Sequence, residues 1–142
     1  MTDLQLTLVA RAICRAEGFR RTPYPDPLSG GEPWTFGHGL TWITEDESRA
    51  IVEGRVAKLE DDVRSMFSDM EWTRIGERRQ GVLVEMSFQL GVFGLSQFKN
   101  MLAALKTGEW SAARAHALDS HWHRQTEKRA ERLAKILELG DA

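Results

Sequence analysis

The chain has 142 residues, of which 42% are hydrophobic and 28% are charged, and its formal net charge is -2. This length suits one domain with a real core and is too short for two ordinary domains. The composition is that of a soluble globular protein. The sequence has no apolar run of about 18 or more residues, so no membrane span is predicted. The single cysteine, Cys14, excludes an internal disulfide and a cysteine-based metal site.

The N-terminal segment is expected to form a helix over residues 2–16. Thr2 with Gln5 suits a capping box, and apolar residues recur behind them at helical spacing. Gly18 is expected to end this helix, which puts Glu17 in its last turn. The segment has no basic stretch and is interrupted by polar residues, so it is a poor secretory signal. We therefore expect a protein that stays in the cytosol after synthesis.

A proline- and glycine-rich segment follows, and it predicts turns with a small β-hairpin. All four prolines of the chain lie in it. Thr44 with Glu47 then forms a second capping-box pattern. Apolar residues behind it repeat at three and four positions, which predicts a long amphipathic helix. This helix is expected to join the β-lobe to the rest of the chain.

The remainder of the sequence predicts helices only. A mostly apolar run indicates a helix from about Arg74 to Leu90 that is buried centrally in a second lobe. Ser96 and Ser111 are expected to cap the N-termini of two short helices, and one or two further helices follow. The predicted fold class is α+β, mainly α.

Three residues near the N-terminus suggest acid/base chemistry. Glu17 lies at a helix end, where the macrodipole disfavours an ionised carboxylate, and this suits a general acid. Asp26 lies between two prolines in a rigid turn and suits a base or an electrostatic partner. Thr35 can hold a water beside that second carboxylate. Two carboxylates in unlike surroundings are what glycosidic bond cleavage needs. The alternatives are a surface acid for Glu17, an Asx-turn residue for Asp26 and an ordinary strand residue for Thr35.

Two groups of segments carry a resemblance to a known family. The first comprises Ala16-Glu17-Gly18-Phe19-Arg20, Tyr24-x-Asp26 and Gly31-Glu32-Pro33-Trp34-Thr35-Phe36-Gly37-x-Gly39. The second comprises Arg78-Arg79, Met86-Ser87-Phe88-Gln89-Leu90-Gly91, Phe98-x-Asn100 and Trp122-x-x-Gln125-Thr126-x-x-Arg129-Ala130-x-Arg132. Together they resemble the phage lysozymes of the T-even type, glycoside hydrolase family 24, also called endolysins or muramidases. The resemblance covers roughly residues 10–136.

The resemblance implies one lysozyme-like domain over residues 1–142. Its parts would be a β-lobe at about 17–43, a connecting helix at about 44–68 and a helical lobe at about 70–138, which would pack with helix 2–16.

The resemblance also implies roles for particular residues. Glu17 would donate a proton to the leaving glycosidic oxygen, while Asp26 and Thr35 would position and activate the attacking water. Arg129 matches a family arginine that approaches the catalytic glutamate, and Gln89 with Trp122 matches a pair that steadies it. The implied substrate contacts are Phe88, Met101 and His116. The alternatives from the residues alone are a solvated helix face for Arg129 and core positions for Phe88, Gln89 and Trp122.

The sequence departs from the family pattern just after the second glycine of the strand. Leu40 stands where the family commonly has a histidine, and His38 lies two residues earlier. Only Leu40 to Ile43 then precede Thr44, so we expect an abbreviated wall of the substrate cleft on that side.

We therefore expect a peptidoglycan hydrolase that cleaves the β-1,4 bond between N-acetylmuramic acid and N-acetylglucosamine with inversion and without a cofactor. It would be a monomeric phage endolysin for host lysis, released from the host cytoplasm by a holin. A lytic transglycosylase and an inactive wall-binding or virion module are the alternatives. A nucleic-acid binder is disfavoured, because acids are interleaved with the bases of residues 124–135. A metal held by His116, His121 and His123 near Asp119 is disfavoured too, because no metalloenzyme motif is present.

Overall fold

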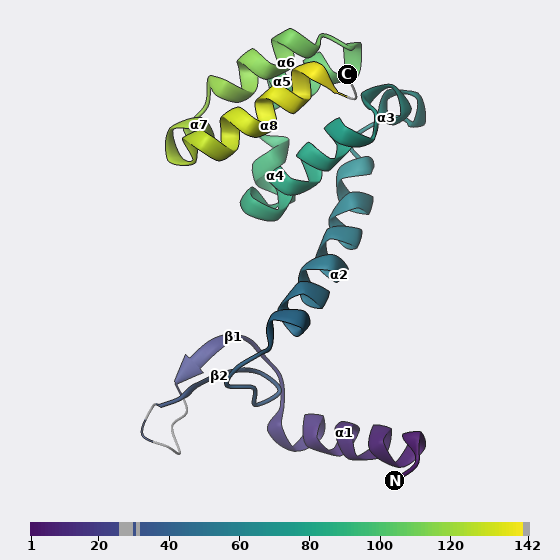
Figure 1. Ribbon diagram of the computed structural model, residues 1–142, viewed down its shortest axis with the longest axis vertical. Helices are drawn as coiled ribbons and strands as arrows, with labels where there is room; N and C mark the ends of the chain where they lie inside the picture. Colours follow the sequence, from purple (N-terminus) through teal and green to yellow (C-terminus); the bar gives the residue numbers. More distant parts are fainter. Residues whose placement is uncertain (26–29, 31, 141–142) are drawn as a thin grey trace. The chain divides into compact units, whose positions relative to one another are not determined.

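The computed structural model describes residues 1–25, 30 and 32–140. Its elements are α1 (Asp3–Glu17), β1 (Arg20–Pro25), β2 (Trp34–Gly37), α2 (Glu45–Arg64), α3 (Asp69–Ile75), α4 (Glu77–Ser96), α5 (Lys99–Thr107), α6 (Trp110–Leu118), α7 (His121–Gln125) and α8 (Glu127–Leu139) (Figure 1). The predicted class, mainly α with a small β-element, is confirmed.

The chain divides into two compact units, Met1–Arg49 and Ala50–Ala142. We describe each unit by itself. That the whole chain makes one domain, with the first helix packed on the helical lobe, stays a prediction.

The first helix of unit 1 begins and ends where its capping residues lie. The hydroxyl of Thr2 accepts a hydrogen bond of 3.2 Å from the main-chain N–H of Gln5. At the other end Gly18 has φ +69°, and its N–H donates to the carbonyl of Cys14. A positive φ is easily adopted by glycine, which explains why the helix stops there. Glu17 is therefore the last helical residue, as predicted.

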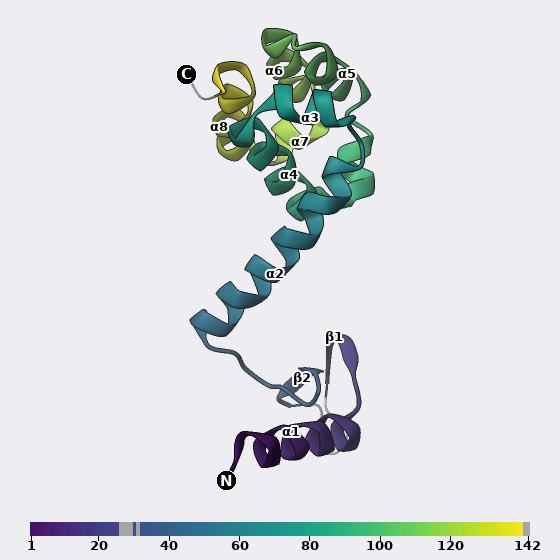
Figure 2. The ribbon, with the colours of Figure 1, turned by 90° about the vertical axis from the view of Figure 1, so that its right-hand side faces the viewer.

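A two-stranded antiparallel hairpin follows α1, as predicted (Figure 2). In its register Tyr24 lies opposite Thr35. The chain turns sharply after β2, because Phe36 and Leu40 exchange two main-chain hydrogen bonds of 2.8 and 2.9 Å. This turn brings Gly39 back beside the end of α1, which matters for the site described below.

The predicted capping box at the start of α2 is confirmed. The N–H of Thr44 donates to the carboxylate of Glu47 at 2.7 Å, and the Thr44 hydroxyl accepts from the Glu47 N–H at 3.2 Å. The bond from the Thr44 N–H stabilises the ionised carboxylate and lowers the pKa of Glu47. The helix ends at Arg64, four residues before the predicted boundary at 68. A second capping box, between Ser68 and Glu71, begins α3.

The predicted helix from Arg74 to Leu90 is wrong at its start and confirmed at its end. Gly76, with φ +79°, separates α3 from α4. Gly91 interrupts the helical backbone with φ +78° and ψ +160°, and a further helical stretch of α4 runs from there to Ser96. The positive φ of this glycine produces the kink inside α4.

The two serine caps predicted for the short helices are also wrong. The Ser96 hydroxyl donates to the carbonyl of Phe93, and α5 begins only after Phe98. The Ser111 hydroxyl donates to the Glu138 carboxylate at 3.1 Å, and α6 begins one residue before Ser111. Both hydroxyls have partners other than a helix N-terminus.

Unit 2 is built around α4, as predicted. Its apolar residues meet those of the surrounding helices in one buried cluster. The largest fully buried apolar side chains are those of Val63, Ile75, Leu83, Met86, Leu95, Met101, Leu105, Leu133 and Leu137. Among the described residues, no helix is long and apolar enough to cross a membrane.

One arginine of α4 contacts three other helices at an edge of this core. The guanidinium of Arg79 donates to the carbonyls of Leu137 and Glu138 at 2.7 and 3.1 Å, and to that of Ile75 at 3.2 Å. It also lies 3.9 Å from the ring centroid of Trp110. The unsatisfied carbonyls at the end of α8 thus gain a charged donor, which fixes that end of the helix.

Candidate active site

The carboxyl group of Glu17 lies directly against the main chain of the turn that follows β2. A Cβ at Gly39 would lie 2.7 Å from Oε2 and 2.8 Å from Cδ of Glu17, so a side chain at this position would displace the Glu17 carboxyl group. Gly39 also has φ +73°, which disfavours residues with a side chain. The structure therefore explains the second glycine of the motif: it leaves room for the proposed acid.

Thr35 lies on β2 of the same unit with its side chain directed inward. It is 9% exposed, and its Oγ1 is buried without a hydrogen-bond partner among the described residues. A buried hydroxyl without a partner is costly, so this one is suited to bind a water or a ligand. The geometry fits the water-positioning role that the resemblance implies, and the role itself stays a prediction.

The other residues of the motif region are Asp26, His38 and Leu40. Asp26 lies outside the described residues. His38 contacts Phe19, with ring centroids 5.4 Å apart. Leu40, at the place of the family histidine, closes the turn through its main chain to Phe36. His38 thus contributes an aromatic contact at the exit of α1.

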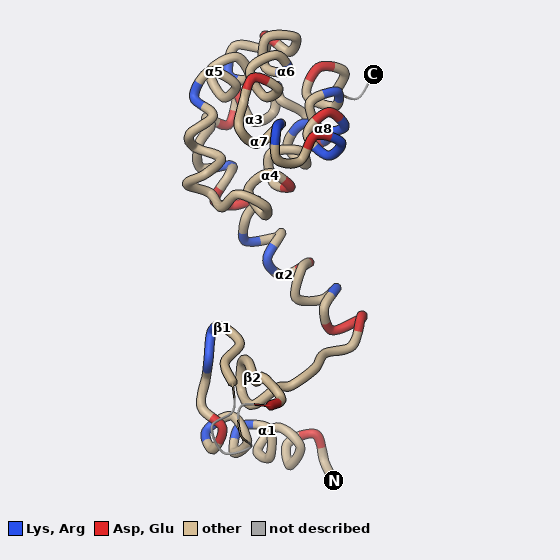
Figure 3. Tube along the Cα trace, turned by 90° about the vertical axis from the view of Figure 1, so that its left-hand side faces the viewer, with Lys and Arg blue, Asp and Glu red and all other residues tan. Residues whose placement is uncertain are grey.

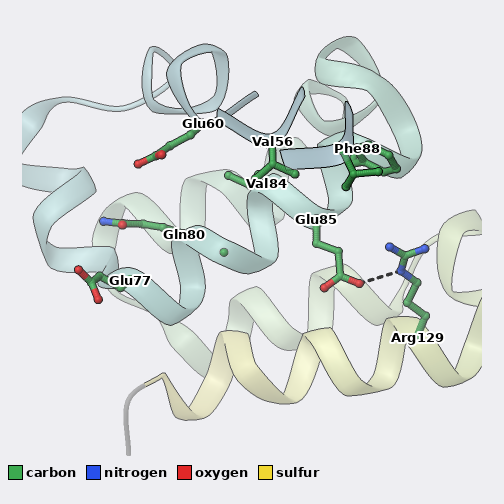
Figure 4. Close-up of a pocket in the computed structure, with 10 residues that line it drawn as sticks. Val56, Glu60, Glu77, Gln80, Val84, Glu85, Phe88 and Arg129 are labelled. Carbon is green, nitrogen blue, oxygen red and sulfur yellow. Dashed lines mark hydrogen bonds and ion pairs between the residues drawn. The ribbon is translucent and has the colours of Figure 1, made fainter. Parts of the chain in front are cut away.

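A groove of about 520 Å³ opens in unit 2 between α2, α4 and α8. Figure 4 shows Phe88 on α4 and Arg129 on α8 at this groove, with Glu85 between the two helices. Val56 and Val84 supply the apolar part of its wall. Phe88 is 42% exposed, so it is available as a contact rather than buried in the core.

Arg129 is held in an ion pair that the sequence did not indicate. Its Nε donates to the carboxylate of Glu85 at 2.9 Å, and Arg132 donates to the same oxygen at 2.7 Å. Figure 3 shows acidic and basic residues alternating along α8, as expected of a solvated face. Arg129 thus lies on a charged helix face, as the alternative interpretation expects. Its ion-pair partner, however, is on another helix. Its approach to Glu17 stays a prediction.

Met101 and His116 meet at a second hollow, of about 440 Å³, between α4, α5, α6 and α7. Met101 is buried and His116 is exposed. The hollow is also lined by Phe98, Asn100 and Trp122. The structure thus brings two of the predicted substrate contacts together and places Phe88 at the other groove.

Gln89 and Trp122 form the pair that the resemblance implies. The indole N–H of Trp122 donates to Oε1 of Gln89 at 3.1 Å, and the indole is 3% exposed. The ring packs edge-on against Phe98, with centroids 5.9 Å apart. A buried indole with its N–H satisfied holds α7 against α4, as the core interpretation expects. That the pair steadies the catalytic glutamate stays a prediction.

Most of the chain is similar to known proteins. A family model described as phage lysozyme matches residues 14–136. The pre-baseplate central spike protein Gp5 of Enterobacteria phage T4 is 34% identical over 100 residues, which are 70% of this chain and 17% of that protein. Probable T4-type lysozyme 2 of Dictyostelium discoideum is 30% identical over 99 residues, which are 69% of this chain and 58% of that protein. The chain therefore spans less than two thirds of the length of either relative.

Proposed function

We propose, because the chain belongs to the phage lysozyme family, that it is a peptidoglycan hydrolase of the glycoside hydrolase class. Its substrate would be the β-1,4 bond between N-acetylmuramic acid and N-acetylglucosamine. The probable T4-type lysozymes of Dictyostelium discoideum support this class of activity, since 69% of the chain aligns with each. The reaction needs a general acid and an activated water and no cofactor.

The placement of Glu17 carries the proposal. Glu17 ends α1 and its carboxyl group lies on the bare main chain of Gly39, in the unit that also holds the buried hydroxyl of Thr35, which has no hydrogen-bond partner in the described part of the chain. In the proposed mechanism Glu17 protonates the leaving glycosidic oxygen. Asp26 and Thr35 orient a water, and the Asp26 carboxylate takes up its proton as the water attacks the opposite face of the sugar.

Attack by water from the opposite face gives inversion at the anomeric carbon, so the first product would have the α configuration. Proton NMR of the reducing ends released in the first minutes of digestion reads that configuration directly. A first product of β configuration would contradict the inverting mechanism and would point to a covalent intermediate.

The hollow around Met101 and His116 is the proposed contact surface for the glycan in unit 2. Its apolar wall includes the ring of Phe98, while Asn100 offers hydrogen bonds to hydroxyl and acetamido groups. A mixture of an aromatic wall and a few polar groups is typical of sites for small polar ligands. Phe88 would contact the substrate from the other groove.

Mass spectrometry of fragments released from purified peptidoglycan tests the proposed reaction. Hydrolysis consumes one water and gives reducing N-acetylmuramic acid ends, whereas a lytic transglycosylase gives anhydro ends that are lighter by one water. We expect reducing muramic acid ends. Anhydro ends would show transglycosylation, and reducing N-acetylglucosamine ends would show that the other glycosidic bond is cut.

The biological setting has two candidates. An endolysin would act from the host cytoplasm after a holin opens the membrane. A virion module is favoured by the 34% identity to the spike protein of phage T4, which aligns over 70% of this chain. Mass spectrometry of purified virions separates them, because an endolysin is absent from the particle and a virion module is present in it. A module of this kind that has lost activity would release no fragments in the preceding experiment.

A further inference from the structure

Three potential metal ligands gather at the junction of α7 and α8, and the proposed reaction uses none of them. The ligand atoms of His123, Glu127 and Glu131 all lie within 4.8 Å of one another. His123 belongs to α7, and the two glutamates belong to the first turns of α8. Of the histidines His116, His121 and His123, for which the sequence disfavours a metal, only His123 belongs to this cluster. The cluster arises from the fold rather than from a motif.

The local backbone explains why these three side chains meet. Thr126 breaks the helix, with φ -137° and ψ +53°, so α7 turns back beside the start of α8. The hydroxyl of Ser120 accepts a hydrogen bond from the His123 N–H, which caps α7 and fixes its orientation. Glu127 and Glu131 are four residues apart and therefore project from the same face of α8. The imidazole is thus held over a pair of carboxylates.

The charges of this cluster are unbalanced without a cation. Two carboxylates at this helical spacing repel each other. Among the described residues, no Lys or Arg forms an ion pair with Glu127 or Glu131, and Arg129 and Arg132 are engaged by Glu85. With a neutral imidazole the cluster carries two negative charges, which one divalent cation would neutralise.

The geometry selects the kind of cation. Nε2 of His123 lies 3.3 Å from Oε1 of Glu131. Two ligands of a tetrahedral Zn²⁺ with bonds of about 2.0–2.1 Å lie about 3.4 Å apart, so this pair already has the required spacing. Glu127 is exposed and can complete the set by rotating its side chain. One imidazole nitrogen with carboxylate oxygens is a donor set that suits Zn²⁺.

We propose that His123, Glu127 and Glu131 bind one Zn²⁺ ion, with water in the remaining position. The ion joins α7 to α8 across Thr126. Because Trp122 precedes His123 and donates to Gln89, the same ion stiffens the segment that anchors α7 on α4. The site is structural, and its expected effect is a higher thermal stability of the protein.

Isothermal titration of the protein with ZnCl2 tests this site, in a Cys14→Ser background that removes the exposed thiol. We expect one ion per chain, with affinity lowered at least about tenfold in His123→Gln and in Glu131→Gln. The matched control is His121→Gln, an exposed histidine on the same helix that lies outside the cluster and should leave the affinity unchanged. At a free Zn²⁺ concentration about 100 times the dissociation constant, the melting temperature should rise by about 5 °C or more, reversibly with EDTA.

Glu127→Gln keeps this test independent of folding. The carboxylate of Glu127 makes no hydrogen bond or ion pair in the described part of the chain, so its substitution removes a ligand and no existing polar contact. A loss of Zn²⁺ affinity in a Glu127→Gln protein with unchanged circular dichroism supports the site. Absence of binding at millimolar Zn²⁺, or affinities unchanged by His123→Gln and Glu127→Gln, overturns it.

Discussion

At the scale of single residues, the hydroxyl of Thr35 has no structural partner among the described residues. Thr35→Val keeps the shape of the side chain and removes the buried polar group, so the free energy of unfolding should change by less than about 1 kcal/mol. If Thr35 positions the attacking water, hydrolysis should fall by about tenfold or more. Thermal unfolding and the rate of wall digestion measure the two effects, with Thr22→Val as the exposed control on β1. Full activity in Thr35→Val would remove Thr35 from the mechanism.

Gly39 permits a second prediction at this scale. Gly39→Ala adds a Cβ that would overlap the Glu17 carboxyl, while Gly30→Ala meets no atom within 4 Å. Both glycines have a positive φ, +73° and +77°, so the backbone strain is matched. We expect Gly39→Ala to lose most of its wall-clearing activity and Gly30→Ala to keep it. Equal losses in the two variants would mean that backbone strain, rather than the Glu17 carboxyl, accounts for the effect.

The sequence indicates individual residues well where the cause is local. The last-turn position of Glu17 follows from Gly18, and the bond between Thr44 and Glu47 follows from their spacing. Glu85 was missed as a partner because it interrupts an apolar run on α4 and looks like an ordinary helix residue. Its partner Arg129 is 44 residues away along the chain, so no local pattern connects them.

At the scale of whole elements, Glu138 links the end of α8 to α6. Hydrogen bonds from Arg114 and Ser111 lower the pKa of its carboxyl group below the ordinary 4.5. A lowered pKa in the native state stabilises the fold above the ordinary value, and this stabilisation is lost as the pH falls through the native value. Glu138→Gln should therefore be less stable than the wild type at pH 7 and should lose less stability between pH 5 and pH 3.

Urea unfolding followed by tryptophan fluorescence at several pH values measures this difference, and added salt should reduce it. Glu53→Gln, at an exposed position on α2, is the control and should follow the wild-type profile. Parallel profiles for the wild type and Glu138→Gln would show that this contact adds nothing to stability.

The helix boundaries show why some elements could be predicted and others could not. The capping box at Thr44 and the side-chain cap at Thr2 involve neighbours in sequence, so the beginnings of α2 and α1 were found. Ser111 was also expected to cap a helix, but its hydroxyl donates to Glu138, which is 27 residues away. Tertiary packing decided this position, and a single sequence does not contain it in readable form.

At the scale of the whole molecule, the chain holds a unit with the proposed acid and a helical unit with a core of its own. The fold class was predictable, because one short proline-rich stretch is followed only by amphipathic segments. The two hollows of unit 2 were not predictable, because each is made by helices that are distant in sequence. The monomeric state stays a prediction, which light scattering of the purified protein measures.

The most direct test of the central claim is the clearing of permeabilised bacteria by wild type and by Glu17→Gln, with Glu53→Gln as a matched exposed glutamate. Removing a general acid lowers a glycosidase rate by about 10²–10⁴-fold. We predict a loss of this size in Glu17→Gln, with an unchanged circular dichroism spectrum, and full activity in Glu53→Gln. Wild-type clearing by Glu17→Gln would contradict the account, and so would a wild-type protein that clears nothing.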